Sequence, residues 1–582
     1  MRGRWLPLAL SVAFLVLIVR LFQIQIYQGR QYKQRSDNNH IRQISIQPSR
    51  GIIYDRDLNV LAENSACYSL FLVPFEYQAH PQDSENIELL VGLSSEDIKA
   101  KISIQGRGPF RPIRLVPNID FSIIAQFEES RHDYPGVFYQ TEPVRSYPSN
   151  VHLSHALGYL GEISKEETQQ STYSQFEWGD IIGKSGVEKS YNQILWGKRG
   201  YRYVEVDVRG QEVGNFSGHR DVDPEPGLNV MLAIDLEMQQ LAEKLLEGKR
   251  GTVIAMDPAQ GDVLVYASAP DYLLESLVNP TPDIWKTLFS DSNSPLLNRG
   301  IQAQLPPGST FKMMTALSGL DQGVINADTE VFCPGYYRIG RRTFHCWEHT
   351  GHGTITLRDA IAKSCNVYFY QLGMDLGIDR WSKDVKRWSF GSLTGIDLPD
   401  EKQGLLPSRH YMDQRYGKNK WSRAIQANIA VGQGDLLVTP VQMLKMVTAI
   451  AQKGIAVQPH VVRAIENRDA RLWERLQPVY DNIEQSHPQN IDLIVEGMNQ
   501  AVNGVGGTAG ASRVTGISVC GKTGTAQNPH GDPHAWYIGF APQKNPKLAI
   551  VVCVENGGSG GVVAAPIAGQ LFRLAKKKGL FL

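Results

Sequence analysis

A serine and a lysine three residues apart mark a place where this chain could do chemistry. They lie in Pro306-Pro-Gly-Ser-Thr-Phe-Lys, as Ser309 and Lys312. Prolines and glycine are natural at a turn that enters a helix, and helical residues three apart share one face. A desolvated lysine amine can be neutral enough to take the proton of a serine hydroxyl, which would make Ser309 a nucleophile. The same pattern also fits a plain helix start with an exposed lysine.

Two further motifs follow in an order that favours the chemical interpretation. Ser364-Cys-Asn366 begins 55 positions after Ser309 (364 minus 309), and Lys522-Thr-Gly-Thr begins 158 positions after Ser364 (522 minus 364). The last motif is typical of a strand at the edge of a cleft, because Gly524 has no side chain and an extended substrate can approach its backbone closely. Lys522 adds positive potential there. The hydroxyls of Thr523 and Thr525 can bind the terminal carboxylate of a peptide.

Ser-x-x-Lys, Ser-Asp-Asn and Lys-Thr-Gly, in this order, are the signature of penicillin-binding proteins and class A β-lactamases. The chain resembles that family, and in particular a class B penicillin-binding protein, because the resemblance covers an N-terminal anchor, a non-catalytic module and a transpeptidase domain. The middle motif departs from the pattern, since Cys365 stands where the family signature has aspartate.

The resemblance implies a role for each motif residue. Ser364 would relay a proton between Lys312 and the leaving group, and Asn366 would hydrogen-bond the substrate amide. The backbone N–H groups of Ser309 and Thr525 would form the oxyanion hole, where each preorganised donor contributes about 10² to 10³ in rate. Ser309 would then attack a D-Ala-D-Ala stem peptide of peptidoglycan, an amine of a neighbouring strand would resolve the ester, and β-lactams would trap the enzyme.

Three of the six cysteines lie between the first and third motifs, interleaved with three histidines: Cys333, His345, Cys346, His349, His352 and Cys365. Three thiolates and one imidazole are a common zinc set, although these spacings are not those of a zinc finger. Buried reduced thiols or a Cys333–Cys346 disulfide are the alternatives. The chain is similar here to the zinc-bearing branch around penicillin-binding protein 2. That resemblance implies a structural Zn²⁺ held by Cys333, Cys346, His352 and Cys365, with the other two histidines at the surface, and it implies no organic cofactor.

The elements that would position these motifs indicate an α+β fold. Residues 234–247 read as a helix capped by Asp235, and residues 562–576 as another helix. Apolar, β-branched segments predict one hairpin at 252–256 and 263–267 and a second at 534–541 and 548–555. We expect both hairpins to join in one antiparallel sheet, with a helical block inserted between them in sequence and helices flanking the strands.

Before this domain, the chain reads as an anchor and an extended module. Trp5 to Val19 is apolar, and a helix from Trp5 to Tyr27 would rise about 30 Å, enough to span a membrane. The stretch is longer than the apolar part of a cleaved signal peptide, which is the alternative. Arg2 and Arg4 precede it and favour a cytoplasmic N-terminus, with the rest of the protein outside a single-pass plasma-membrane anchor.

We therefore predict three parts: residues 1–28 as cytoplasmic tip and transmembrane anchor, 29–225 as a β-rich pedestal of the dimerisation-domain kind, and 226–582 as the transpeptidase domain. The second boundary rests on an acidic, proline-containing stretch at residues 221–227. The length of 582 residues agrees with several domains. The 59 basic and 59 acidic residues cancel, which argues against nucleic acid as a partner.

Several functions share these motifs. A secreted β-lactamase needs neither anchor nor pedestal, a β-lactam sensor needs further spans or a cytoplasmic effector, and a silent scaffold needs no intact motifs. A D,D-carboxypeptidase also shares the motifs, but the architecture favours a cross-linking D,D-transpeptidase. The class B resemblance further implies a SEDS-class, RodA-like glycosyltransferase as partner. The cysteine cluster favours the cell-elongation machinery, with the septal class B enzymes as the alternative.

Overall fold

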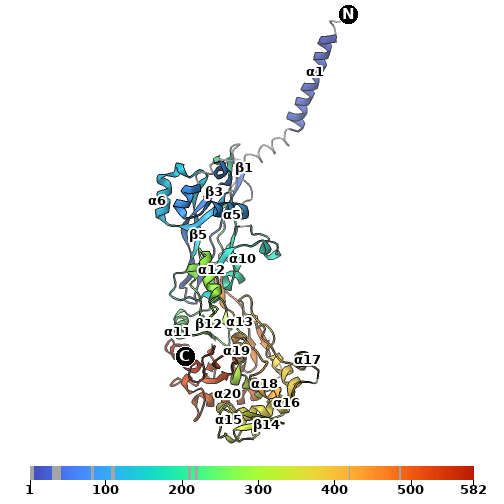
Figure 1. Ribbon diagram of the computed structural model, residues 1–582, viewed down its shortest axis with the longest axis vertical. Helices are drawn as coiled ribbons and strands as arrows, with labels where there is room; N and C mark the ends of the chain where they lie inside the picture. The colour runs from blue at the N-terminus through green and yellow to red at the C-terminus, as the bar shows by residue number, and fades with distance from the viewer. Residues whose placement is uncertain are drawn as a thin grey trace. The chain divides into compact units, whose positions relative to one another are not determined.

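The computed structural model describes residues 5–28, 41–79, 84–105, 112–177, 179–206, 212–215, 221–418, 420–483 and 487–581. The chain divides into two compact units (Figure 1). The smaller unit holds Met1–Gly51, Ser65–Val144 and Trp196–Gly227, and the larger unit holds Ile52–Asn64, Arg145–Leu195 and Leu228–Leu582. The units interleave along the sequence. The boundaries proposed at residues 28 and 225 stay predictions.

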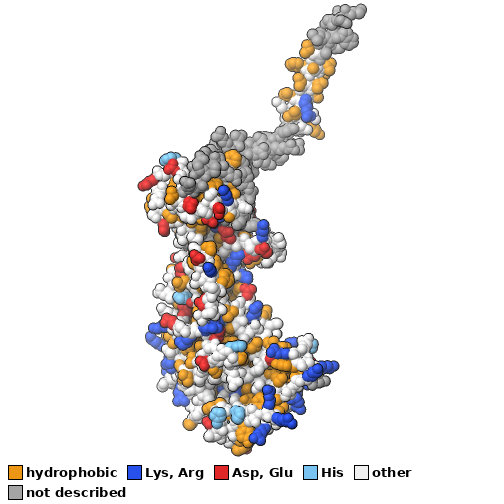
Figure 2. Space-filling view, in the orientation of Figure 1, with side chains coloured by type: hydrophobic (Ala, Val, Ile, Leu, Met, Phe, Trp, Pro, Cys, Tyr) orange, Lys and Arg blue, Asp and Glu red, His pale blue; other side chains and the backbone are white. Residues whose placement is uncertain are grey.

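One N-terminal helix is long and apolar enough to cross a membrane. Helix α1 (Trp5–Phe22) continues into a π-helical turn, η1 (Gln23–Tyr27). The 18 residues from Leu10 to Tyr27 have a mean hydropathy of 2.0, and none of them is buried. Figure 2 shows apolar side chains along this helix. Exposed apolar surface of this extent is typical of a site of membrane or protein contact. Arg2 and Arg4, which the orientation prediction uses, lie outside the described residues.

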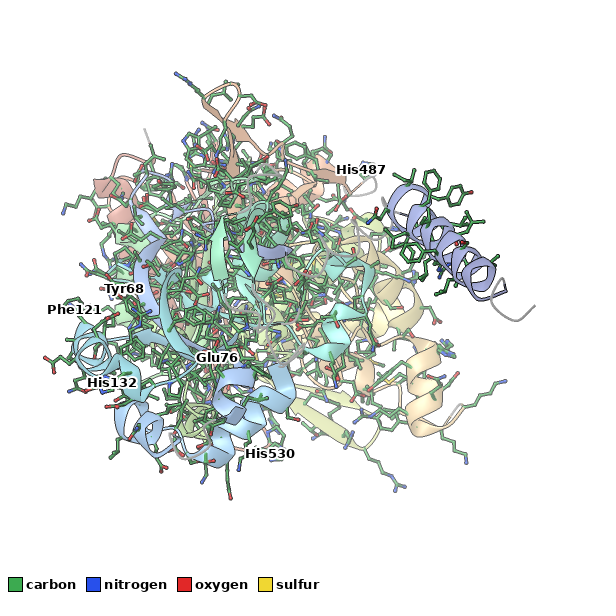
Figure 3. The ribbon with its side chains drawn as sticks, turned by 90° about the horizontal axis from the view of Figure 1, so that it is seen from above. Tyr68, Glu76, Phe121, His132, His487 and His530 are labelled. Atoms are coloured by element: carbon green, nitrogen blue, oxygen red, sulfur yellow. The ribbon has the colours of Figure 1, made fainter. Side chains whose placement is uncertain are left out.

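The smaller unit packs short helices on antiparallel strands. Strand β3 (Val60–Leu72) pairs with both β4 (Ile113–Ile119) and β5 (Val137–Ser146), and a separate sheet has the order β1-β8-β9. The helices contribute buried residues such as Ile98 and Phe127, whereas Phe121, at the start of α6, is 72% exposed and points outward (Figure 3). The sequence did not predict these helices, because it indicated mainly extended structure in this region. The remaining bounds are β1 (Ile41–Ile46), α3 (Pro74–Ala79), α4 (Ser84–Val91), α5 (Ser95–Gln105), α6 (Phe121–Glu129), η3 (Arg131–Asp133), β8 (Gly200–Val206) and β9 (Glu212–Asn215).

A five-stranded antiparallel sheet forms the centre of the larger unit, in the order β12-β11-β23-β22-β21. Its strands are β11 (Gly251–Met256), β12 (Val263–Ala269), β21 (Cys520–Ala526), β22 (His534–Ala541) and β23 (Leu548–Val554). The two predicted hairpins are therefore confirmed, and they join where β11 pairs with β23. Strand β21, which carries the Lys522 motif, is at the edge of the sheet, and the predicted α+β class is confirmed.

Both faces of this sheet are covered, which explains why its central strands are apolar without alternation. Val253 and Ala255 of β11 pack in one core with α11 (Leu236–Leu246) and α21 (Ala564–Lys577). Their neighbours Ile254 and Met256 face the other core, which includes α19 (Pro440–Ala451). Asp235 caps α11 as predicted, because its carboxylate accepts the N–H of Met238 at 3.1 Å.

The helical block comes between β12 and β21 in sequence. Its helices α15, α16, α18 and α20 lie together in the larger unit (Figure 1). The block comprises α12 (Pro282–Ser290), α13 (Arg299–Gln302), η6 (Gly308–Phe311), α14 (Lys312–Asp321), β13 (Val331–Cys333), β14 (Tyr336–Ile339), β15 (Arg342–His345), β16 (Gly353–Ile355), α15 (Leu357–Ala362), α16 (Asn366–Arg387), α17 (Arg409–Tyr416), α18 (Ile425–Ala430) and α20 (Pro488–Asn503).

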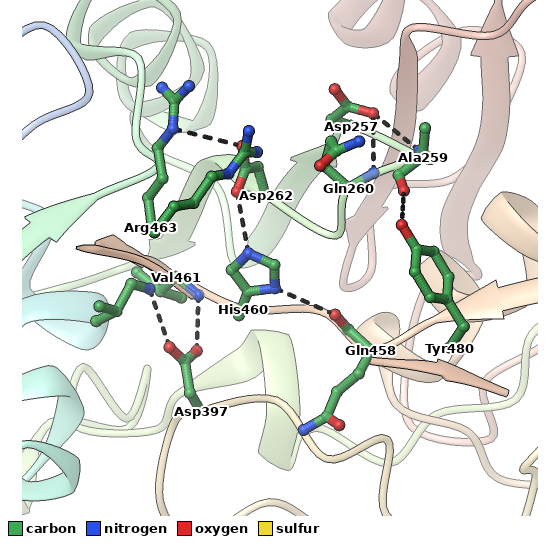
Figure 4. A network of polar contacts seen from close by, with 12 residues as sticks. Asp257, Ala259, Gln260, Asp262, Asp397, Gln458, His460, Val461, Arg463 and Tyr480 are labelled. Atoms are coloured by element: carbon green, nitrogen blue, oxygen red, sulfur yellow. Dashed lines mark hydrogen bonds and ion pairs between the residues drawn. The ribbon is translucent and has the colours of Figure 1, made fainter. Parts of the chain in front are cut away.

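A buried polar network ties the start of β12 to the neighbouring sheet of the larger unit (Figure 4). Asp262 accepts hydrogen bonds from His460 at 3.0 Å and Arg475 at 2.7 Å, and Asp397 accepts the N–H groups of Val461 and Val462. The bonds of Asp262 hold the start of β12 against His460 and Arg475, and those of Asp397 hold the segment of Val461 and Val462 in place. The other elements of this unit are β2 (Ile53–Tyr54), α7 (Ser154–Leu157), β6 (Leu160–Glu162), α8 (Lys165–Thr168), η4 (Ser171–Tyr173), β7 (Ile181–Gly183), α9 (Gly186–Ser190), α10 (Asn192–Trp196), β10 (Val230–Leu232), η5 (Leu274–Leu277), β17 (Ile455–Val457), β18 (Val462–Asn467), β19 (Leu472–Arg475), β20 (Tyr480–Asn482) and η7 (Gly510–Ser512).

Candidate active site

Ser309 and Lys312 lie at the point where a 3₁₀ turn becomes a helix. Ser309 is in η6 and half-buried, and its carbonyl accepts the N–H of Lys312, the first residue of α14. Gly308 has a φ of +57° and donates its N–H to the carbonyl of Gly432 at 2.8 Å. The positive φ explains why glycine precedes the serine. The turn therefore presents Ser309 while Lys312 enters the core.

The Lys312 ammonium group is completely buried and donates to three oxygens. Its Nζ lies 2.8 Å from the Ser364 carbonyl, 3.3 Å from Ser364 Oγ and 2.8 Å from Asn366 Oδ1. Burial lowers the pKa of Lys312 to about 8, although the charges of Cys365 and Cys346 oppose this shift. A lysine with such a pKa can accept a proton near neutral pH.

The middle motif joins two helices through a strained residue. Ser364 follows α15 and has a φ of +58°, a conformation that non-glycine residues seldom adopt. Cys365 occupies the N-cap position of α16, and Asn366 is the first residue of that helix. This geometry aims the side chains of Ser364 and Asn366 toward Lys312 while Cys365 joins the cysteine cluster.

Lys522 reaches the same serine from the sheet. Its Nζ donates to Ser364 Oγ at 2.9 Å and to the Thr523 carbonyl at 2.8 Å, and its side chain is fully buried. Burial lowers the pKa of Lys522 well below its usual value, and the charge of Lys312 lowers it further. Both lysines thus donate to one hydroxyl oxygen. Because that oxygen has two acceptor lone pairs, its own proton is free to point elsewhere.

The edge strand β21 lies against the turn that carries Ser309. A Cβ built on Gly524 would lie only 2.9 Å from the Pro307 carbonyl oxygen and 3.1 Å from Thr310 Cγ2, which is why no side chain fits there. The first and third motifs are therefore neighbours. The Thr523 hydroxyl donates to Thr508 Oγ1 at 3.1 Å, and the exposed Thr525 accepts the N–H of Gly560 at 3.3 Å.

The cysteine cluster lies directly behind the middle motif. Cys333, Cys346, His352 and Cys365 bring their ligand atoms within 4.8 Å of one another, and the three thiols are almost fully buried. His352 Nδ1 is 3.6 Å from the sulfurs of both Cys333 and Cys346. All six cysteines are free, so the alternative of a Cys333–Cys346 disulfide is wrong. A metal ion fits this donor set: ligands at 2.0 to 2.3 Å in a tetrahedron lie about 3.5 to 3.8 Å apart.

Some groups at the site carry no motif signal in the sequence. The Gly432 carbonyl accepts the N–H of Gly308, and the Thr508 hydroxyl oxygen accepts the O–H of Thr523. The indole N–H of Trp347 donates to the carbonyl of Lys363, the residue before Ser364, at 3.0 Å. Trp347 could have been noticed because it adjoins Cys346. Thr508 and Gly432 could not, since only the fold brings them to the site. His345 and His349 are exposed, as expected.

Two family models match the chain. The penicillin-binding protein transpeptidase domain matches residues 251–573, and the penicillin-binding protein dimerisation domain matches residues 45–232. Among curated proteins, peptidoglycan D,D-transpeptidase MrdA of Haemophilus influenzae is 32% identical, over 95% of this chain and 88% of the relative. The protein of the same name from Escherichia coli is 31% identical, over 96% and 90%.

Solved structures give the same result. The complex between penicillin-binding protein PBP2 and MreC from Helicobacter pylori has a chain that is 30% identical, with a TM-score of 0.80, covering 92% of this chain and 100% of that one. A chain in a structure described as structural coordination of polymerization and crosslinking by a peptidoglycan synthase complex is 29% identical, with a TM-score of 0.71 and 98% coverage of each chain. This chain therefore belongs to the class B penicillin-binding proteins, and within them to the MrdA type of D,D-transpeptidase.

Proposed function

We propose that this protein cross-links peptidoglycan stem peptides as a serine D,D-transpeptidase, with Ser309 as the nucleophile. The observation that carries the proposal is the convergence of Lys312 and Lys522 on the oxygen of Ser364, next to the turn of Ser309. A buried lysine with a lowered pKa, a relay hydroxyl and a second cation are the parts that an acyl transfer from D-Ala-D-Ala needs.

In the proposed reaction, Lys312 takes the proton of Ser309 as the serine oxygen attacks the carbonyl of the penultimate D-Ala. The N–H groups of Ser309 and Thr525 stabilise the oxyanion. The C–N bond then breaks, and Ser364 passes a proton to the nitrogen of the departing D-Ala. The amine of a neighbouring stem peptide attacks the ester, returns a proton through the same groups and restores the Ser309 hydroxyl.

Substrate recognition would use the edge of β21. An extended peptide can pair with this strand by main-chain hydrogen bonds, while Asn366 binds its amide. Lys522 supplies positive potential for the terminal carboxylate, and Thr523, Gly524 and Thr525 form the strand beside it. A β-lactam has the same carboxylate and a reactive amide, so it would acylate Ser309 and remain bound.

For the cysteine cluster we propose a structural Zn²⁺. The support is the donor set and its 3.6 Å spacing. Zinc would fix the loop that begins α16 and so hold Ser364 and Asn366 in place; its chemistry here would be structural, because four protein ligands leave no open position for substrate. The backbone N–H of Asn366 donates to the Cys346 sulfur at 3.4 Å, which links the cluster to the motif directly.

We also propose a single-pass plasma-membrane anchor at α1, with the catalytic unit on the outer side. The exposed apolar helix supports the anchor, and MreC is the partner in the Helicobacter pylori complex. A role in cell elongation, beside a SEDS-class, RodA-like glycosyltransferase, follows from the MrdA-type relatives. A septal role is the alternative, and depletion of the protein discriminates: we expect loss of side-wall growth from an elongation enzyme and a block of division from a septal enzyme.

Mass spectrometry of the benzylpenicillin-treated protein tests the proposal. We expect one penicilloyl adduct, located on the peptide that contains Ser309, and none on Ser309→Ala. Ser290→Ala, at an exposed serine in α12, is the matched control and should be acylated normally. Supplying a labelled donor peptide with an amine acceptor then separates the transpeptidase from a D,D-carboxypeptidase, which would release only hydrolysed product. An adduct that persists on Ser309→Ala would contradict the assignment.

A further inference from the structure

Helix α16, which begins at Asn366, is broken near its middle. Gly377 has φ +70° and ψ +162°, outside the helical region, and divides the helix into two segments. A cavity of about 470 Å³ opens at this break, lined by residues of α16, α17 and α18 and by Trp421. Figure 1 shows these three helices in the larger unit. A volume of this size is typical of a small-ligand site.

A buried amide in the cavity wall has nothing to bond. Gln426 lines the cavity and is only 4% exposed, yet neither its Nε2 nor its Oε1 has a hydrogen-bond partner among the described residues. Leaving buried polar atoms unpaired costs about 1 to 3 kcal/mol each, so native proteins rarely do it. One donor and one acceptor side by side match a peptide bond, which presents the complementary pair.

The rim of the cavity is positive. Three guanidinium groups line it, from Arg380, Arg409 and Arg423, against the single carboxylate of Asp379. Asp379 is paired with Arg409 at 2.6 Å. Arg380 donates only to backbone carbonyls, those of Leu376 and Asp375, and Arg423 is exposed. Nearby Asp413 accepts the indole N–H of Trp421. Two guanidinium charges therefore remain for an anion, and a carboxylate is a favourable partner for guanidinium groups.

We infer that this cavity binds the carboxyl-terminal end of a peptide. The terminal carboxylate pairs with Arg380 and Arg423, and the amide of Gln426 bonds the peptide group before it. Met374 and Ile378 provide apolar wall for small side chains. A stem peptide of peptidoglycan and the C-terminus of a protein both have this chemistry. Only the stem-peptide source rests on the proposed function.

Two helices that line the cavity, α16 and α18, connect it to the candidate active site. The first segment of α16 starts at Asn366, which contacts Lys312, and α18 ends two residues before Gly432, which holds Gly308. A ligand that bridges Gln426 and the segments of α16 therefore touches two elements that position the catalytic groups. By linkage, binding of a penicillin in the catalytic cleft and binding of the peptide in the cavity should change each other's affinity.

A binding experiment on the full-length chain in detergent tests the inference. Ser309 is first acylated with benzylpenicillin, so that peptide cannot occupy the catalytic cleft. Fluorescein-labelled acetyl-D-Ala-D-Ala is then titrated by anisotropy, beside its C-terminal carboxamide and the L-Ala-L-Ala form. We expect saturable binding of the carboxylate and at least tenfold weaker binding of the carboxamide. Preference for the D form identifies a stem peptide, whereas preference for the L form identifies a protein C-terminus.

Variants locate the site. Gln426→Leu and Arg423→Gln should each weaken binding of the carboxylate five- to tenfold, whereas Arg358→Gln, an exposed arginine paired with Glu496, should not. Gln426→Leu should unfold at the same or a higher temperature, because it removes an unpaired buried amide. Penicillin acylation measured on the same samples keeps this test separate from that of the proposed function.

Three outcomes would overturn the inference. One is no saturable binding in a protein that acylates normally. Another is equal binding of carboxylate and carboxamide. The third is displacement of the probe by inorganic phosphate together with unchanged binding by Gln426→Leu, which would make the cavity an anion site without peptide recognition.

Discussion

Two buried polar clusters share the segment of residues 364–366, and they satisfy their polar atoms differently. In the lysine cluster, each ammonium group has oxygen acceptors at 2.8 to 3.3 Å from the protein itself. In the cysteine cluster, His352 Nδ1 lies 3.6 Å from the sulfurs of Cys333 and Cys346, which is longer than a strong hydrogen bond. The lysine cluster thus satisfies its polar atoms with protein groups, whereas the cysteine cluster has the donor set and spacing of a metal site.

The largest expected effect is a loss of penicillin acylation when the lysine cluster is changed. Lys312→Met should reduce the rate of penicillin acylation by about 10³-fold, since it removes the proposed general base. The free energy of unfolding should stay the same or rise, because a buried cation is costly to the fold. Acylation is measured with a fluorescent penicillin and stability by thermal unfolding. Lys286→Met, at an exposed lysine in α12, is the control; acylation by Lys312→Met within threefold of the parent protein would refute the role.

The second effect should appear in both measurements. Cys346→Ser should lower the free energy of unfolding by on the order of 3 kcal/mol, the stabilisation that a ligand gives at about 100 times its Kd. Acylation should fall about tenfold or more because the 364–366 segment loses its support. Cys67→Ser, outside the cluster, should change neither quantity. A metal-free preparation that unfolds and acylates like the untreated protein would remove the structural metal.

Much of the catalytic unit could be predicted from the sequence because its signals are local. Apolar, β-branched segments, a capping Asp235 and turn residues are enough to predict both hairpins and α11, and the Lys522 motif could be placed on a strand at the edge of a cleft. The helices at 74–129 were not predicted, because their short amphipathic stretches compete poorly with the surrounding Pro and Gly signals.

The candidate site was predictable only as far as its motifs reach. Motif order indicated which residues would meet, but not that Lys312 and Lys522 would converge on one oxygen. Trp347, Thr508 and Gly432 act through single contacts across the fold, which no spacing announces. The cavity at Gly377 depends on a backbone break that a glycine inside a helical pattern permits but does not require.

The pH dependence of acylation would sharpen the comparison by testing the lysine cluster directly. Lys312 must be neutral to act as a base, and burial lowers its pKa to about 8. Acylation at low penicillin concentration should therefore rise about tenfold from pH 7 to pH 9. The pKa of Lys522 is lowered as well, by burial and by the charge of Lys312. A flat profile over this range would exclude Lys312 as the titrating base.

The smallest effect concerns the contact between the clusters. Trp347→Phe keeps the ring but loses the hydrogen bond to Lys363, which is worth about 1 kcal/mol. We expect the acylation rate to fall about three- to fivefold, with no change in the unfolding temperature. The control is Trp473→Phe, whose ring packs on Tyr54 elsewhere in the larger unit. A Trp347→Phe protein that loses stability instead would make this residue part of the supporting cluster alone.

The burial of helix α14 limits the substitutions that could make the protein resistant to β-lactams. Every side chain from Lys312 to Leu320 is buried, so nearly any substitution there changes packing volume in a close-packed interior. Drug resistance that preserves wall synthesis should therefore arise at the exposed rim, for example near Trp347 or Thr525. Laboratory selection for β-lactam resistance should therefore give few substitutions in α14 and more at the exposed residues near it.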